Sequence, residues 1–159
     1  MKSKYISLVL LLASVPLCPS VTAAERKPPG DPGHTHEQRT AGPNRGRVMT
    51  GINPRAEFFV TPDRKVQITF LGPDGTAIAP DAQVMTVTAG DRAAPTKLSF
   101  VRQGNVLLST NALPAGNDFP VVVEIVPSSG STKAVEKFYF DSSQCGECKN
   151  AEYACICAH

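Results

Sequence analysis

Hydrophobic and polar residues alternate with a period of two along the body of the chain, and this pattern predicts β-strands. In the clearest run Val66, Ile68 and Phe70 alternate with polar neighbours, and a Gly-Pro-Asp-Gly turn follows. The alternating segments lie at 57–60, 65–71, 85–89, 97–100, 106–110, 119–125 and 133–140. About seven short strands in roughly ninety residues are typical of an immunoglobulin-like antiparallel β-sandwich. We assign this all-β domain to residues 46–141.

The predicted sandwich contains no histidine and no cysteine, and no stretch of it has a sustained helical period. Its carboxylates, Glu57 among them, are expected to be solvated or to form turns. Met85 lies at an alternating position and is expected to pack in the core. Because neither a Ser-His-Asp constellation nor a pair of acids in one cleft can be assembled from these residues, we expect a protein that is not an enzyme.

The N-terminus has the pattern of a secretory signal peptide, which we place at residues 1–23. Two lysines precede an apolar run at 6–17, and small residues then suit cleavage after Ala23 or Ala24. The run of about a dozen apolar residues is too short to span a bilayer comfortably. We therefore expect a periplasmic or secreted protein whose mature chain has no stable membrane span. An uncleaved anchor and a lipid-modified Cys18 are the alternatives.

The charge of the chain argues against one class of partner. The net charge is +2, and Lys2 and Lys4 lie in the predicted signal peptide. The mature chain would then carry equal numbers of basic and acidic residues. A neutral chain lacks the basic surface that binds nucleic acid or anionic lipid, so we expect no nucleic-acid partner.

Residues 24–45 are rich in proline and glycine, and the main part of this segment lacks large aliphatic side chains. Such a segment cannot offset the entropy lost on ordering, so we predict a disordered arm. It contains His34 and His36, whose side chains would point the same way in an extended chain and could share one ion. The alternative is that both are exposed histidines in a linker.

The last segment, 142–159, concentrates the reactive chemistry of the mature chain. It contains Cys145, Cys148, Cys155, Cys157 and His159 in the pattern C-x2-C-x6-C-x-C-x-H. Thiolate and imidazole together are ligands of Zn(II), and thiolates alone suit Cu(I). A tight turn would point the first two sulfurs at one ion, and an extended end of the chain would aim the last three ligands to one side. A short helix over 147–154 is an alternative that would also gather three sulfurs on one face.

Two other interpretations of the cysteines remain open. In an oxidising compartment, Cys145 and Cys148 could form disulfides with Cys155 and Cys157, and the tail would then be a staple on a structural or interaction module. The Cys-x2-Cys spacing also occurs in thiol oxidoreductases. Those enzymes place the motif at the start of a helix in a βαβ unit, however, and this motif follows a predicted antiparallel sandwich.

The sequence Ala41-Gly-Pro-Asn-Arg-Gly-Arg47, which follows the His-x-His arm, resembles the GP-x-GGR opening of periplasmic proteins in heavy-metal efflux systems. Arg45 stands where that opening has glycine. The chain is too short to hold the helical hairpin and lipoyl domains of a pump adaptor subunit. The resemblance implies a metal-handling context, with an envelope metal-efflux component as a partner. Together with the tail it predicts an exported protein that sequesters or delivers Zn(II) or Cu(I).

Overall fold

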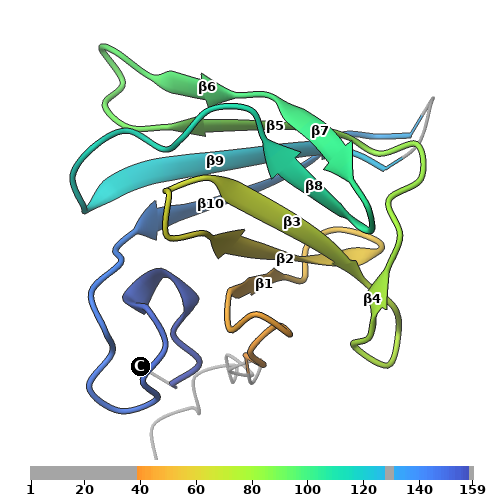
Figure 1. The fold of residues 1–159 in the computed structure, drawn as a ribbon, viewed down its shortest axis with the longest axis horizontal. Coiled ribbons are helices and arrows are strands. Elements are labelled where there is room, and N and C mark those ends of the chain that lie inside the picture. The colour runs from red at the N-terminus through yellow and green to blue at the C-terminus, as the bar shows by residue number, and fades with distance from the viewer. Residues whose placement is uncertain (1–38, 128–130, 158–159) are drawn as a thin grey trace, which may run out of the picture. The chain divides into compact units, whose positions relative to one another are not determined.

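The computed structural model describes residues 39–127 and 131–157, and these residues form two facing antiparallel sheets (Figure 1). Three short strands lie among longer ones because turns interrupt the alternating pattern often. The strands are β1 (Arg47–Met49), β2 (Arg55–Val60), β3 (Val66–Leu71), β4 (Ala77–Ile78), β5 (Val84–Ala89), β6 (Thr96–Leu98), β7 (Phe100–Gln103), β8 (Val106–Ser109), β9 (Phe119–Val126) and β10 (Ala134–Phe140). A single 3-10 turn, η1 (Glu152–Ala154), follows them.

One sheet has the strand order β1-β2-β3-β8-β7, with β4 also paired to β3, and the other has the order β10-β9-β5-β6. Every strand pair of the described residues is antiparallel. The prediction of an all-β antiparallel sandwich with a cysteine-rich C-terminal tail is therefore confirmed.

The structure divides one predicted strand in two. The alternation over 97–100 predicted one strand, but Leu98 pairs with β5 in one sheet and Phe100 pairs with β8 in the other. The chain therefore crosses between the sheets at Ser99. Alternation cannot reveal this crossing, because Leu98 is buried and Phe100 is half-buried on opposite sides of the same core.

The core lies between the sheets and follows the predicted alternation. In β9 the side chains of Phe119, Val121, Val123 and Ile125 are buried, and the residues between them are half-buried. Met85 is also buried, as predicted. This regular inward face gives each strand one register in which its apolar side chains leave water.

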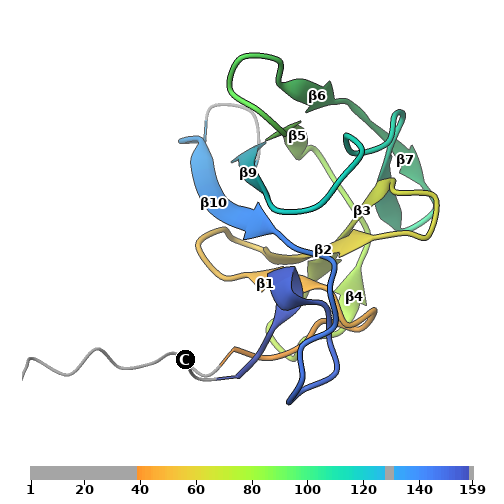
Figure 2. The same cartoon turned by 90° about the vertical axis from the view of Figure 1, so that its left-hand side faces the viewer.

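The tail continues beyond β10 and folds back against the edge of the sandwich. Figure 2 shows η1 beside β1, and η1 contacts both β1 and β10. Tyr153 and Ala154 of η1 belong to the same buried cluster as the strands. The hydrophobic core thus extends past residue 141, where the predicted sandwich ended.

Truncating Phe58 tests this common core, because its side chain is completely buried and contacts both Phe138 and Tyr153. Phe58→Ala is expected to lower the free energy of unfolding by about 3–5 kcal/mol through lost burial and a cavity. Urea unfolding followed by circular dichroism measures this. Val101→Ala, at a site that is 53% exposed, is the control and should change stability by less than about 0.5 kcal/mol. Equal effects of the two substitutions would contradict the assigned core.

Candidate metal centre

The cysteine segment folds into a short turn that is closed by its own backbone. Gln144 and Ala151 form an antiparallel bridge, and the amide of Cys145 donates to the Asn150 carbonyl at 2.8 Å. The amide of Lys149 donates back to the Cys145 carbonyl at 3.2 Å. Lys149 has a φ of 63°, which lets the chain reverse direction directly after Cys148. The turn therefore points the first two sulfurs to the same side.

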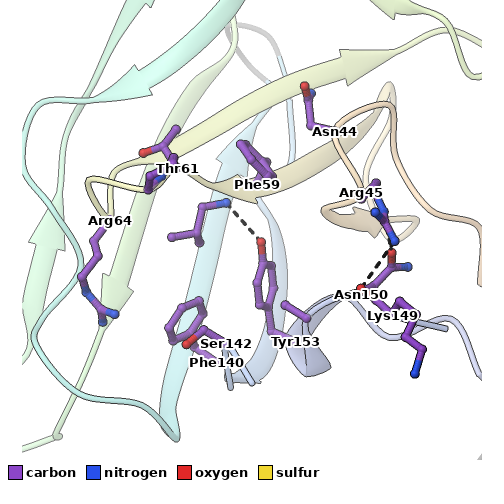
Figure 3. Close-up of a pocket in the computed structure, with 13 residues that line it drawn as sticks. Asn44, Arg45, Phe59, Thr61, Arg64, Phe140, Ser142, Lys149, Asn150 and Tyr153 are labelled. Carbon is purple, nitrogen blue, oxygen red and sulfur yellow. Dashed lines mark hydrogen bonds between the residues drawn. The ribbon is translucent and has the colours of Figure 1, made fainter. Parts of the chain in front are cut away.

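Tyr153 fixes this turn to the sandwich. Its ring packs 5.1 Å from the ring of Phe140 and 6.1 Å from that of Phe58, measured between centroids. Its hydroxyl accepts a hydrogen bond from the Val60 amide at 3.1 Å (Figure 3). The tyrosine is only 6% exposed, so the cysteines on either side of it in sequence cannot move far.

Main-chain hydrogen bonds hold the same segment from the other side. The amide of Tyr153 donates to the Asp141 carbonyl at 2.9 Å, and that of Glu152 donates to the Ser143 carbonyl at 2.8 Å. The guanidinium of Arg47 donates to the Tyr153 carbonyl at 3.5 Å. The segment that carries the cysteines is consequently part of the folded body.

The four cysteine sulfurs converge. The Sγ of Cys155 lies 3.4 Å from that of Cys145 and 3.7 Å from that of Cys148, and the Sγ atoms of Cys145 and Cys157 are 3.9 Å apart. All four sulfurs lie within 4.8 Å of one another. All four are free thiols in this structure. The fold therefore brings together the four cysteines that the sequence predicted as ligands.

The spacing of the sulfurs suits one metal ion. Zn–S bonds of about 2.3 Å in a tetrahedron place neighbouring sulfurs about 3.8 Å apart, close to the distances found here. Cys145 and Cys155 are buried, whereas Cys148 and Cys157 are half-buried. One edge of the group therefore faces the core and the other faces solvent. Four thiols in this arrangement can hold one soft or borderline ion.

Backbone amides make the thiol of Cys148 more acidic than an ordinary cysteine. Hydrogen bonds from the backbone of Ile156 and then of Asn150 lower the pKa of Cys148 from 9.0 to about 6. Burial, followed by the neighbouring thiol of Cys155, raises the pKa of Cys157. Without metal Cys148 is therefore a thiolate at neutral pH, and a second negative charge on Cys155 or Cys157 beside it is unfavourable. A bound cation would remove that penalty.

The turn geometry decides between the two local structures that the sequence allowed. A helix over 147–154 does not form, because only residues 152–154 make a 3-10 turn. The tight turn at Cys145–Cys148 is the correct alternative. Cys155 continues from η1 in an extended conformation with φ −61° and ψ 135°, and the amide of Cys157 donates to its sulfur at 3.4 Å.

A buried glutamate supports the cysteine turn indirectly. Glu57 is completely buried, so the expectation of a solvated carboxylate is wrong at this position. One oxygen of its carboxylate accepts from the amides of Asn44 and Gly46, each at 2.8 Å, and the other accepts from the Asn44 side chain at 2.7 Å. These charge-assisted bonds offset the cost of burial. The alternating pattern hid this residue because it sits on a strand in which three consecutive residues are buried.

The loop that Glu57 holds belongs to the segment predicted as a disordered arm. Its last residues are ordered in the structure, where Ala41 pairs with Arg47 and the amide of Arg45 donates to the Gly42 carbonyl at 2.9 Å. A Cβ atom at Gly42 would overlap the Glu57 carboxylate. The glycine that begins the Gly-Pro-Asn-Arg-Gly stretch is therefore required by close approach of the backbone to a buried acid.

Arg45 connects this loop to the cysteine turn. Its Nε donates to the Asn150 side-chain oxygen at 3.1 Å, and its Nη2 donates to the Lys149 carbonyl at 3.4 Å (Figure 3). Asn150 is buried and its backbone supplies one of the hydrogen bonds that acidify Cys148. Arg45 thus supports the sulfur group from outside, by holding Asn150 and Lys149 in the turn that carries the cysteines. The sequence analysis did not identify this role.

The histidines remain predictions. His34, His36 and His159 lie outside the described residues, and so does the predicted signal peptide. Among the residues that the structure describes, no helix is long and apolar enough to cross a membrane.

In the reduced, metal-free protein we expect one thiolate to form with a midpoint near pH 6, from Cys148. Thiolate ultraviolet absorbance across a pH series measures this transition. Cys148→Ser should remove it, and Cys157→Ser should keep it, because the pKa of Cys157 is raised instead. A transition that survives in Cys148→Ser would contradict the assignment.

Removing the Arg45 side chain should weaken metal binding without unfolding the protein. Arg45 has a φ of 64°, a conformation that glycine adopts without strain, so Arg45→Gly deletes only the hydrogen bonds to Asn150 and Lys149. Loss of such outer support typically reduces metal affinity roughly 10- to 100-fold. Competition with a chelator measures the affinity. Arg102→Gln, on exposed β7, is the charge control and should leave it unchanged.

Comparisons with protein-family models, with curated proteins and with solved structures find no match for this chain.

Proposed function

We propose that this chain is an exported, non-enzymatic metal-binding protein that holds one soft or borderline ion between Cys145, Cys148, Cys155 and Cys157. The observation that carries the proposal is the convergence of four sulfurs within 4.8 Å of one another. The pattern of the N-terminal residues, read as a signal peptide, supports export.

The ligand set favours Zn(II) over Cu(I). Four thiolates around one ion form the closed tetrahedral site that is typical of Zn(II). The sulfur spacing of 3.4–3.9 Å between the close pairs agrees with that geometry. Cu(I) also prefers thiolates and remains the second ion to test. Since thiols lose protons when they bind metal, affinity should rise with pH.

The exposure of the four sulfurs bears on whether the ion is stored or passed on. Cys145 and Cys155 are buried and Cys148 and Cys157 are half-buried, so an acceptor could reach the ion from one side only. Such a site retains its ion and releases it when another thiol replaces the outer ligands. In this proposal the protein sequesters metal or delivers it in the cell envelope, with a metal-efflux component as the receiving partner.

A specific observation favours a second candidate function. Tyr153 and Ala154 lie in the core between the two cysteine pairs, so closing the sulfur group would also staple the C-terminus onto the sandwich. A structural or interaction module would need only that staple, made by disulfides. Free-thiol titration and metal analysis of the protein from its native compartment separate the candidates. Free thiols with one ion support the metal-binding protein, and absence of both supports a disulfide-stapled module.

Replacing two ligands tests the leading proposal. Cys155→Ser with Cys157→Ser should abolish stoichiometric binding of zinc, because two thiolates cannot hold the ion tightly. Elemental analysis of anaerobically purified protein measures the metal, and circular dichroism checks that the sandwich remains folded. Ile156→Ser lies between the two cysteines and keeps all four thiols, so it should bind one zinc per chain. Unchanged metal content in the double variant would contradict the proposal.

A further inference from the structure

The four sulfurs can be divided into two close pairs, and each pair joins a half-buried sulfur to a buried one. The Sγ of Cys148 lies 3.7 Å from that of Cys155, and the Sγ of Cys157 lies 3.9 Å from that of Cys145. Cys145 and Cys155 are only 3% and 7% exposed, whereas Cys148 and Cys157 are half-buried. A reagent in solution therefore reaches one member of each pair before the other.

This arrangement suits thiol–disulfide exchange, which proceeds in two steps. A thiolate first attacks a small disulfide and forms a mixed disulfide, and a second thiolate then displaces the small thiol. The first step needs an accessible sulfur, which Cys148 and Cys157 supply. The second step needs a close neighbour, which the buried member of each pair supplies. Each bridge requires only a short approach, since an S–S bond of about 2.0 Å forms between sulfurs that are 3.7 or 3.9 Å apart.

The other pairings are less suited to this reaction. The sulfurs of Cys145 and Cys155 lie 3.4 Å apart, but both residues are buried, so neither forms the first mixed disulfide. A bridge between Cys155 and Cys157 would be strained, because only Ile156 separates them and Cys155 has an extended backbone. The favoured pairing is therefore Cys148 with Cys155 and Cys145 with Cys157.

The contacts that dock the tail do not use the sulfurs. Tyr153 is 6% exposed, and its hydroxyl accepts a hydrogen bond from the Val60 amide. The backbone amide of Cys145 donates to the Asn150 carbonyl at 2.8 Å. Because these contacts involve rings and main-chain groups, the bridges can form by movement of the cysteine side chains while the tail stays docked.

We propose that the sulfur group is a redox switch, in which small-molecule disulfides oxidise it to a Cys148–Cys155 and a Cys145–Cys157 bridge and the metal ion leaves. The release of metal rests on the proposed function, whereas the pairing of the sulfurs does not. Reduction of the two bridges restores the site, so the chain holds its ion under reducing conditions and gives it up under oxidising ones.

The reaction balances for Zn(II) without any further reagent. Each of two small disulfides accepts two electrons from one pair of cysteine thiolates. The four cysteine thiolates become two bridges, and four small thiolates and one Zn(II) ion are released. Since the thiolate is the form of cysteine that binds metal, the bridged sulfurs no longer hold the ion.

Bis(2-hydroxyethyl) disulfide, a small uncharged disulfide, tests the switch. The reduced full chain, with Cys18→Ser so that only the four tail cysteines react, is treated with it once after loading with zinc and once without metal. Both samples should form the two bridges named above, and a chelating dye should record one zinc released for every two bridges. Another pairing, or a reaction that stops at mixed disulfides, would overturn the proposal. If the reduced chain binds no zinc, the proposed function fails, and the metal-free sample still decides the pairing.

Mass spectrometry can assign the bridges in this sequence. Cleavage after Glu147 separates the first two cysteines from each other, and cleavage after Lys149 separates them from the last two. Fragmentation of the peptide bonds of Ile156 distinguishes the last two cysteines.

Two double variants that each retain two tail thiols test the role of exposure. Cys145→Ser with Cys157→Ser retains the half-buried Cys148 and the buried Cys155, whose sulfurs are 3.7 Å apart. Cys148→Ser with Cys157→Ser retains Cys145 and Cys155, which are closer, at 3.4 Å, but both buried. The first variant should close its bridge at least about tenfold faster, because exchange rates depend on access to the attacking sulfur. Equal rates would contradict the assigned order of attack, and circular dichroism checks that both variants are folded.

Discussion

The packing of Tyr153 between Phe58 and Phe140 is the interaction on which the candidate metal centre depends. It places one aromatic ring of the tail inside the core of the sandwich, with its hydroxyl satisfied by the Val60 amide. Burying such a ring stabilises the docked segment by about 2–3 kcal/mol. Cys155 follows this anchor after one residue, and the antiparallel bridge before it returns the chain to Cys145 and Cys148. The sulfurs come together because both cysteine pairs are adjacent, along the chain or across the bridge, to the docked Tyr153.

A series of polar contacts also connects the sandwich to the cysteine turn. Glu57 fixes the loop at Gly46, the loop presents Arg45, and Arg45 holds Asn150 in the cysteine turn. Each contact is short and at least partly removed from water, so each is worth more than an exposed one. A buried acid on β2 is thereby connected to the turn that carries Cys148, although the two residues are distant in sequence.

The same turn gives rise to two different chemical surfaces. On one side it gathers four thiols, and backbone hydrogen bonds lower the pKa of Cys148 among them. On the other it places Lys149 at the mouth of a cleft that it shares with Arg64.

The sequence by itself determined the strands and the cysteines that come together in the tail. Alternation predicted β2, β3, β5, β9 and β10, because each strand has one apolar face that must leave water. The cysteine spacing predicted a shared site, because the four thiols lie within thirteen consecutive residues and a single turn can bring them together.

Only the tertiary structure decided the crossing at Ser99, the burial of Glu57 and the support of the cysteine turn by Arg45. These features depend on contacts between residues far apart in sequence, and a local hydrophobic pattern contains no information about such contacts. The cleft between the sandwich and the tail arises in the same way, since its lining residues come from separate segments that the docked tail brings together.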